Sequence, residues 1–182
     1  VTFVATLVIP LQFAILLGIA ISIVLHVFRA SNKVVVTQWV LQPEGFPLEQ
    51  PAPKRLPSHQ LTLLHVYGSL FFAAARSMEE MLPEVADATH AVVAINLRGK
   101  SQIGSTFVTV LQHYSQALRN QDSKLMLVGV DPAVRDQLAK TGVLKLIGEE
   151  NVFLATPQLG TALNQAVAAA TAWLGQPTNG EK

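Results

Sequence analysis

The side chains of this 182-residue chain that could do acid–base or metal chemistry are few and scattered. Its five histidines stand at positions 26, 59, 65, 90 and 113, and none are paired at the spacing of a metal site. Glu79-Glu80 and Glu149-Glu150 are adjacent pairs, and neighbours on a helix do not face each other, which argues against an acid–base dyad. The chain has no cysteine, which excludes disulfides, zinc–thiolate sites, iron–sulfur clusters and cysteine nucleophiles.

One basic segment could contact an anion. Arg98, Gly99 and Lys100 follow the apolar run from Ala91 to Leu97. A loop that only faces solvent is the simpler interpretation of these three residues. The sequence also has no glycine-rich phosphate-binding motif and no nucleophile motif of the GxSxG type. We therefore expect a protein that is not an enzyme, with no catalytic residue, no metal and no cofactor.

The composition sets broad limits on the class of protein. Half of the residues are hydrophobic and only 14% are charged, below the ~25% typical of soluble domains. The net charge of +1, without any basic run, argues against a nucleic-acid partner. The length suits one domain and an appendage. Because the chain begins with Val1 rather than Met, we expect a fragment of a longer protein.

The apolar character is concentrated at the beginning, where Val1–Phe28 contain no charged residue. A helix that crosses a bilayer core of ~30 Å needs about 20 apolar residues. The stretch Leu11–Phe28 nearly provides them, and Pro10 stands where a helix could begin. Residues 1–9 are then either the tail of a preceding membrane helix or an outer turn of the same helix beyond a kink. A signal peptide would need a basic start, which is absent, and a buried helix of a soluble protein would be shorter.

We therefore expect residues 1–30 to hold the terminal transmembrane segment or segments. Ala14, Gly18 and Ser22 are four residues apart and share one helix face, and small residues at that spacing let membrane helices approach closely. This face would pack against further helices. Arg29 and Lys33 follow at once, and basic residues at this end favour a cytoplasmic location for what comes next.

The remainder alternates between strand and helix patterns. Strands are expected at 34–41, 61–66, 91–97, 124–130 and 152–155, helices at 70–88 and 105–120, a helix capped by Asp131-Pro132 and ending near Gly142, and a final helix from Thr156-Pro157. Five prolines make 42–60 a loop or extended insertion. Ala162, Ala166 and Ala170 should bury the final helix against the sheet. This order predicts an α/β fold with a mixed sheet and crossover helices.

Three segments resemble the STAS domain, named for sulfate transporters and anti-sigma factor antagonists. They are VYGSLFFAAARSMEEML (Val66–Leu82), INLRGKSQIGSTFVTVL (Ile95–Leu111) and LVGVDPAVRDQLAKTGVLKLIG (Leu127–Gly148). With the strand at 34–41 they cover most of residues 34–174. The paired phenylalanines of the first segment are similar to members of the family that are fused to transporters.

The apolar beginning is similar to the end of SulP transporters, just before their STAS domain. The resemblance implies a C-terminal part of a SulP inorganic anion transporter, for sulfate or bicarbonate, with residues 1–30 in the cell (inner) membrane and residues 31–182 as a cytoplasmic STAS domain. Its implied partners are the upstream transmembrane domain, membrane lipid and a second copy in a homodimer. The STAS domain would serve regulation, folding or trafficking, and dimer contacts. The alternative is a stand-alone, membrane-tethered STAS regulatory module similar to anti-sigma factor antagonists.

One segment departs from the family pattern. STAS domains usually carry Asp-Ser-Thr/Ser-Gly before the central helix, and here the matching residues are Gly104, Ser105, Thr106 and Phe107. In anti-sigma factor antagonists the hydroxyl at the position of Thr106 is phosphorylated, and a phosphate there would meet the N–H groups of a helix N-terminus. The other interpretation is that Ser105 or Thr106 only caps the helix.

Overall fold

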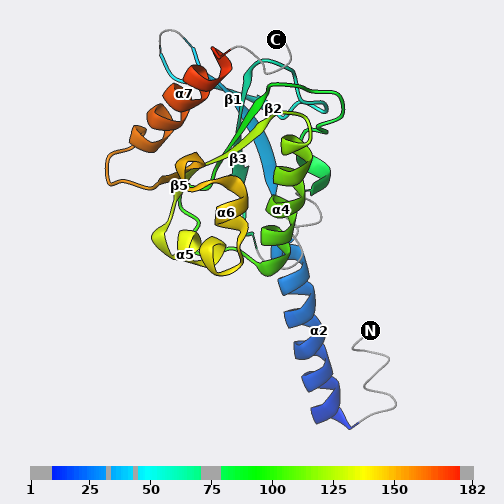
Figure 1. Cartoon of the computed structure of the whole chain (residues 1–182). Coiled ribbons are helices and arrows are strands. Elements are labelled where there is room, and N and C mark those ends of the chain that lie inside the picture. The colour runs from blue at the N-terminus through cyan, green and yellow to red at the C-terminus, as the bar shows by residue number, and fades with distance from the viewer. Residues whose placement is uncertain (1–9, 32–33, 43–44, 71–78, 177–182) are drawn as a thin grey trace.

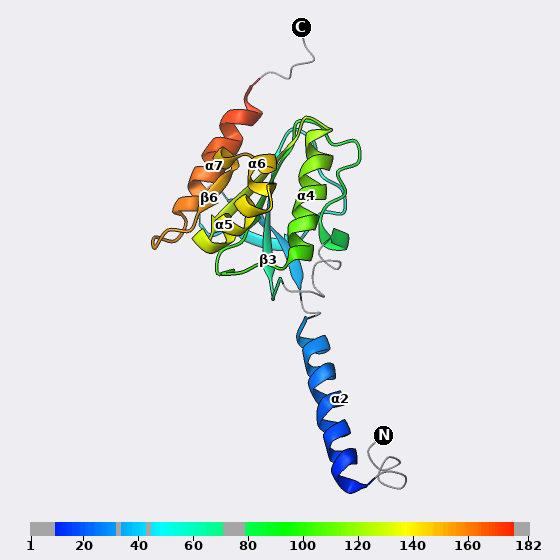
Figure 2. The ribbon, with the colours of Figure 1, turned by 60° about the horizontal axis from the view of Figure 1, so that its bottom comes forward.

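The computed structural model describes residues 10–31, 34–42, 45–70 and 79–176. Helix α2 (Leu11–Ser31) projects from an α/β unit that contains the rest of the described chain (Figures 1 and 2). Within the described ranges, no helix combines the length and the apolar character that crossing a bilayer requires. The predicted transmembrane segment at 1–30 therefore stays a prediction, and its residues 1–9 lie outside the described residues.

The α/β unit is built on one mixed sheet of six strands in the order β2-β1-β3-β4-β5-β6. Strand β1 pairs antiparallel with β2 and β3, and the pairs β3–β4, β4–β5 and β5–β6 are parallel. The strands are β1 (Val35–Val40), β2 (Leu48–Pro51), β3 (Leu61–Tyr67), β4 (Val92–Asn96), β5 (Lys124–Val130) and β6 (Val152–Leu154). The predicted α/β class and mixed sheet are confirmed.

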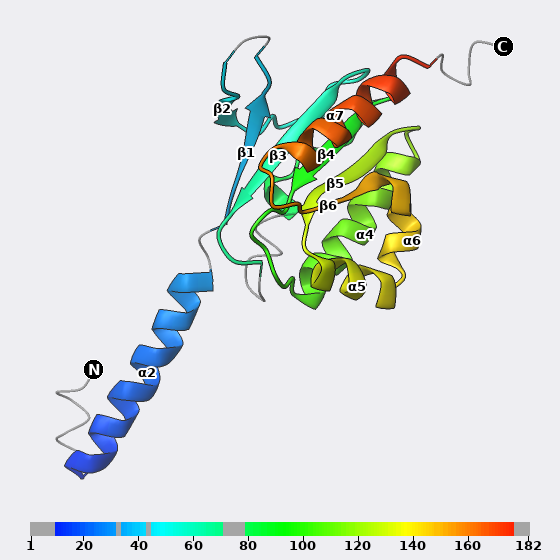
Figure 3. The same cartoon turned by 90° about the vertical axis from the view of Figure 1, so that its left-hand side faces the viewer.

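Helices cover both faces of the sheet, as Figure 3 shows. Helices α4 (Ser105–Arg119), α5 (Pro132–Lys140) and α6 (Val143–Ile147) lie on one face, and α7 (Thr161–Leu174) lies on the other. A short 3-10 turn, η1 (Glu149–Asn151), leads into β6. Burial from both sides explains why β4 and β5 are nearly continuous apolar runs.

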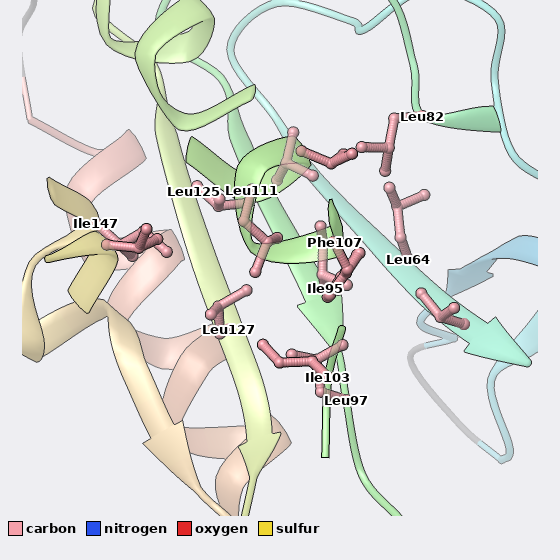
Figure 4. Close-up of a cluster of buried hydrophobic side chains, with 14 of the residues drawn as sticks. Leu64, Leu82, Ile95, Leu97, Ile103, Phe107, Leu111, Leu125, Leu127 and Ile147 are labelled. Carbon is pink, nitrogen blue, oxygen red and sulfur yellow. The ribbon is translucent and has the colours of Figure 1, made fainter. Parts of the chain in front are cut away.

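The larger core lies between the sheet and α4 to α6. Phe107 and Leu111 of α4 are fully buried and point toward Ile95 of β4 and Leu127 of β5 (Figure 4). These residues recur at helical spacing on α4, whereas His113 on the same helix faces solvent. α4 therefore has one buried face and one face open to solvent.

The smaller core lies under α7. Ala162, Ala166 and Ala170 are at most 3% exposed and belong to the same buried cluster as Leu63 and Met126 of the sheet. Small side chains allow the helix to lie close to the strands. The predicted burial of these three alanines is confirmed.

The beginning of α7 was predicted too early. The helix begins at Thr161, after Gly160 with φ +90° at its N-cap, and not at Thr156-Pro157. Residues 156–160 form a turn instead, in which the Thr156 side chain donates to the Gln158 carbonyl at 2.9 Å. Leu159 lies in this turn and is 77% exposed. The Thr-Pro pair resembled a helix start because proline is common at the first helical position, but here the turn comes before the helix.

The helix predicted at 70–88 ends earlier than expected. Residues 71–78 lie outside the described residues, and the helical part that follows ends at Met81. Pro83 has no N–H and disfavours a helical residue before it. Glu84 instead forms a bridge with Arg55, in which backbone bonds of 2.9 Å join Glu84 to Lys54 and to Leu56.

The proline-rich stretch 42–60 contains a strand that the sequence did not predict. β2 lies at the edge of the sheet and ends at Pro51, and an edge is where a strand tolerates proline. Its Gln50 side chain donates to the Gln38 side chain of β1 at 3.0 Å. The predicted loop or extended insertion is thus extended in part, and the sequence did not predict that this part pairs with β1.

Candidate functional site

The basic segment after β4 lies at the carboxyl edge of the parallel strands. The Arg98 N–H donates to the Asn96 side chain at 3.0 Å, and its guanidinium donates to the Thr156 carbonyl at 2.9 Å. Arg98 therefore joins the end of β4 to the turn before α7. A guanidinium held in this way acts as a structural link, and the three-residue segment offers less to an anion than its sequence suggests.

Lys100 lies beside a small polar hollow between the loops that follow β3 and β4. Its ammonium group donates to the carbonyl of Gly68, and partial burial lowers the pKa of the Lys100 side chain. The hollow is lined by Gly68, Ser69, Leu70, Gly99, Lys100, Ser101 and Gln102. The Lys100 ammonium group is thus already bonded to a backbone carbonyl of this chain.

The start of α4 presents two hydroxyl groups to solvent. Gly104 occupies the N-cap with extended backbone, so neither Ser105 nor Thr106 holds the cap position that was expected for them. Both are exposed in the first turn, which contains no acidic residue. The Gly104 N–H donates to the Leu70 carbonyl at 3.0 Å, and no side chain caps the start of the helix.

Two buried residues hold this helix start in place. Ile103 before it is 3% exposed and Phe107 after it is fully buried, and Figure 4 shows both side chains directed into the core. The Gln137 side chain of α5 donates to the Ile103 carbonyl at 2.7 Å. The departure from the family pattern at Phe107 thus has a packing reason: the side chain fills the core beneath α4.

Ala14, Gly18 and Ser22, predicted to form a membrane-packing face, lie on helix α2, and their packing against other helices stays a prediction. Gly18 and Ser22 line a shallow hollow on the helix, whereas Ala14, which is 1% exposed, does not line it. The other lining residues are Ile15, Ile19, Ile23 and His26. Ten large apolar side chains of α2 are at least 38% exposed, namely Phe13, Ile15, Leu16, Leu17, Ile19, Ile21, Ile23, Val24, Leu25 and Val27.

The structure also brings together rings that the sequence left scattered. His65 lies between Trp39 and Tyr67, with both ring centroids 4.5 Å away. His90 stacks on Trp173 with centroids 4.2 Å apart. Alternation along β3 could have placed His65 and Tyr67 on one face, but only the register with β1 brings Trp39 to them.

A metal site does not emerge from these histidines. In the ranges that the structure describes, no group of three or more His, Asp or Glu side chains could hold a metal ion. The histidines contact aromatic rings and backbone instead.

Residues 51–158 match the family model described as the STAS domain. The match spans more than half of the chain and includes β3 to β6 with α4 to α6 between them, and the chain belongs to the STAS domain family.

Solved structures share this fold at low sequence identity. The murine Solute Carrier 26 family member A9 (Slc26a9) anion transporter in the inward-facing state matches with a TM-score of 0.67 and 16% identity, over 94% of this chain and 28% of that chain. A sulfate transporter family protein from Wolinella succinogenes matches with a TM-score of 0.54 and 21% identity, over 68% of this chain and 93% of that one. The present chain thus spans little more than a quarter of the murine transporter. No curated protein matches it.

Proposed function

We propose that the chain is the C-terminal part of a SulP-type secondary anion transporter. The observation that carries the proposal is the extent of the match to the murine anion transporter. A match over 94% of the chain cannot omit the 21-residue helix α2, so the resemblance continues beyond the 51–158 segment of the STAS domain. The Wolinella protein, matched over 93% of its own length, accounts for only 68% of this chain.

The exposed side chains of α2 support the same proposal. Ten large apolar side chains between Phe13 and Val27 are exposed on this one helix. Contiguous apolar surface of this kind marks a site of contact with protein or membrane. We place residues 1–30 in the membrane domain of the transporter, where Gly18 and Ser22 pack against upstream helices and other side chains contact lipid. Residues 31–182 are then the cytoplasmic STAS domain, and the protein resides in the inner membrane.

The transported substrate is an inorganic anion, with sulfate and bicarbonate as the candidates. The anion site belongs to membrane helices upstream of Val1, and the described part of this chain has no catalytic role. The STAS domain contributes to regulation, to folding or trafficking and to contacts within a homodimer.

Anion uptake tests this proposal. Cells that carry the complete gene should accumulate labelled sulfate or bicarbonate above cells with an empty vector. Early truncation before Val1 should abolish uptake, and Gln112→Ala on the exposed face of α4 should preserve it. Uptake of neither anion, with the protein present in the membrane fraction, would contradict the proposal.

A second candidate function is a membrane-tethered regulatory module, and the exposed hydroxyl groups of Ser105 and Thr106 favour it. A phosphoryl group there would lie at the N-terminus of the 15-residue helix α4. Mass spectrometry of protein from cells should then find phosphate in the 105–106 segment, and Thr106→Ala should remove it if Thr106 is the acceptor. Absence of phosphate under all growth conditions would exclude this mode of regulation.

A further inference from the structure

A row of three rings crosses the first strands of the sheet, on the face that α7 covers further along. Trp39 of β1 stacks on His65 of β3 with an interplanar angle of 12°, and Tyr67 meets the other side of His65 at 70°. Glu49 of β2 lies over the row and accepts from the Thr37 hydroxyl at 2.7 Å. The row and Glu49 thus join three strands through side chains as well as through their backbone ladders.

One end of this row lies next to the joint between α2 and the sheet, and the row runs from there along β1 to Trp39. β1 is the first strand after α2, and Val35 at its start pairs with Tyr67 at the end of β3. Figure 3 shows the start of β1 close to the end of α2. β1 is thus the strand through which α2 connects to the sheet, and its pairing with β3 anchors that strand.

His65 fits this row better as a neutral ring than as a cation. Its Nδ1 atom is buried and has no hydrogen-bond partner in the part of the chain that the structure describes. An imidazolium donates from both nitrogens, so a proton at Nδ1 would be left without an acceptor. Burial and the positive charge of Lys100 both lower the pKa of His65.

Other groups around His65 act in both directions. The Glu49 carboxylate raises the pKa of His65, but Glu49 is exposed and its charge is screened by water. The Trp39 face attracts a cation. The Tyr67 phenol is neutral in this pH range, because its pKa is ordinarily 10 and the neighbouring Glu49 carboxylate raises it further. Neither β1 nor α7 contributes a charged side chain. Burial and Lys100 therefore prevail, and His65 favours the neutral form.

We propose that the Trp39–His65–Tyr67 row is an acid-sensitive clasp that holds β1 on β3 while His65 is neutral and loosens the joint to α2 when His65 takes up a proton. The clasp concerns the joint itself and does not depend on the identity of the transported anion. Because the pKa of His65 is lowered from its ordinary 6.5, the loosened state binds the proton more readily. The clasp is therefore fully closed above about pH 6.5 and weakens as the pH falls below it.

Hydrogen–deuterium exchange of the full chain in detergent micelles tests the clasp. After correction for the intrinsic exchange rate, peptides from β1 and β3 should lose protection several-fold between about pH 7.5 and about pH 5.5, a window chosen around the ordinary pKa of histidine. Peptides from β5 should keep their protection. Equal protection of β1 at both pH values would overturn the proposal.

Two variants assign the effect to His65. His65→Phe keeps an aromatic ring in the row without a titrating group, and should keep β1 protected at both pH values. If the larger ring disturbs packing, His65→Gln should lower protection equally at both pH values and so also remove the pH dependence. His113→Gln changes an exposed histidine of α4 and should behave as the unmodified chain. A pH dependence that survives in both His65 variants would overturn the assignment.

Glu49→Gln distinguishes the contribution of the neighbouring carboxylate from that of His65. The hydrogen bond from the Thr37 hydroxyl holds the pKa of Glu49 below its usual 4.5, so the contribution of Glu49 is lost only as the pH falls below that value. The variant should therefore keep the loss of protection between about pH 7.5 and about pH 5.5. If this variant abolishes the loss in that window, the carboxylate and not His65 is the sensor.

Discussion

At the residue scale, a single backbone angle explains why position 148 is a glycine. Gly148 connects α6 to η1 with φ +94°, a conformation that residues with a side chain rarely adopt. A Cβ atom there would lie 2.5 Å from the Glu150 carboxylate and 2.9 Å from the Asn151 side-chain nitrogen. Glu150 could swing away, but Asn151 is buried and bonded to the Ile147 carbonyl at 2.7 Å.

We therefore expect Gly148→Ala to lower the free energy of unfolding by about 1–3 kcal/mol. Chemical denaturation followed by circular dichroism in detergent measures it. Gly175→Ala is the matched control, because Gly175 has φ −78° and a Cβ there would make only ordinary contacts, at 3.5 Å to the Thr171 carbonyl and 3.9 Å to the Ala172 carbonyl. Equal stability of the two variants would show that the backbone at Gly148 relaxes freely.

The departure at Phe107 belongs to the same scale. Phe107 stands where STAS domains usually have a glycine, and the structure shows its side chain fully buried in the core. Phe107 and Leu111 are four residues apart, the spacing of one helix face, and both lie on the buried face of α4. The exposure of Ser105 and Thr106 follows from it, since a helix that buries Phe107 turns the preceding residues outward.

At the element scale, the two faces of the sheet differ in how closely helices approach. α7 contacts the strands through Ala162, Ala166 and Ala170, and Ala166 is 1% exposed. A larger side chain at this position would push the helix away from Leu63 and Met126 in the same cluster. Overpacking of this kind typically costs about 1–3 kcal/mol.

Ala166→Leu should therefore lower the melting temperature of the chain, whereas Ala172→Leu on the exposed side of α7 should leave it nearly unchanged. Differential scanning calorimetry in detergent compares the two variants. If both melt together with the unmodified chain, α7 does not depend on close contact with the sheet.

Elements with a strong period were predictable, and those defined by tertiary pairing were not. β4, β5 and α4 follow from apolar runs or helical spacing. β2 exists because its side chains and backbone meet β1, which no local pattern in a proline-rich stretch reveals. The His65 row depends on register between two strands, and the late start of α7 depends on a turn linked to Arg98.

At the scale of the whole molecule, the α/β unit and helix α2 differ in how much of their apolar surface is buried. The α/β unit buries most of its large apolar side chains in two clusters on either side of the sheet. Helix α2 instead exposes ten of them and projects from that unit (Figure 1). Such an uncovered surface in water promotes association, so the solubility of the chain should be decided by its first thirty-odd residues.

A chain that begins at Val34 should accordingly remain in the supernatant without detergent and elute as a single compact species in size-exclusion chromatography. The unmodified chain should sediment or aggregate unless detergent or lipid covers α2. Removal of residues 177–182 is the control, because a polar tail should not alter this behaviour. A detergent-free, monodisperse full chain would mean that α2 finds its apolar partners within the chain itself, and the placement of this helix in a membrane domain would lose its physical basis.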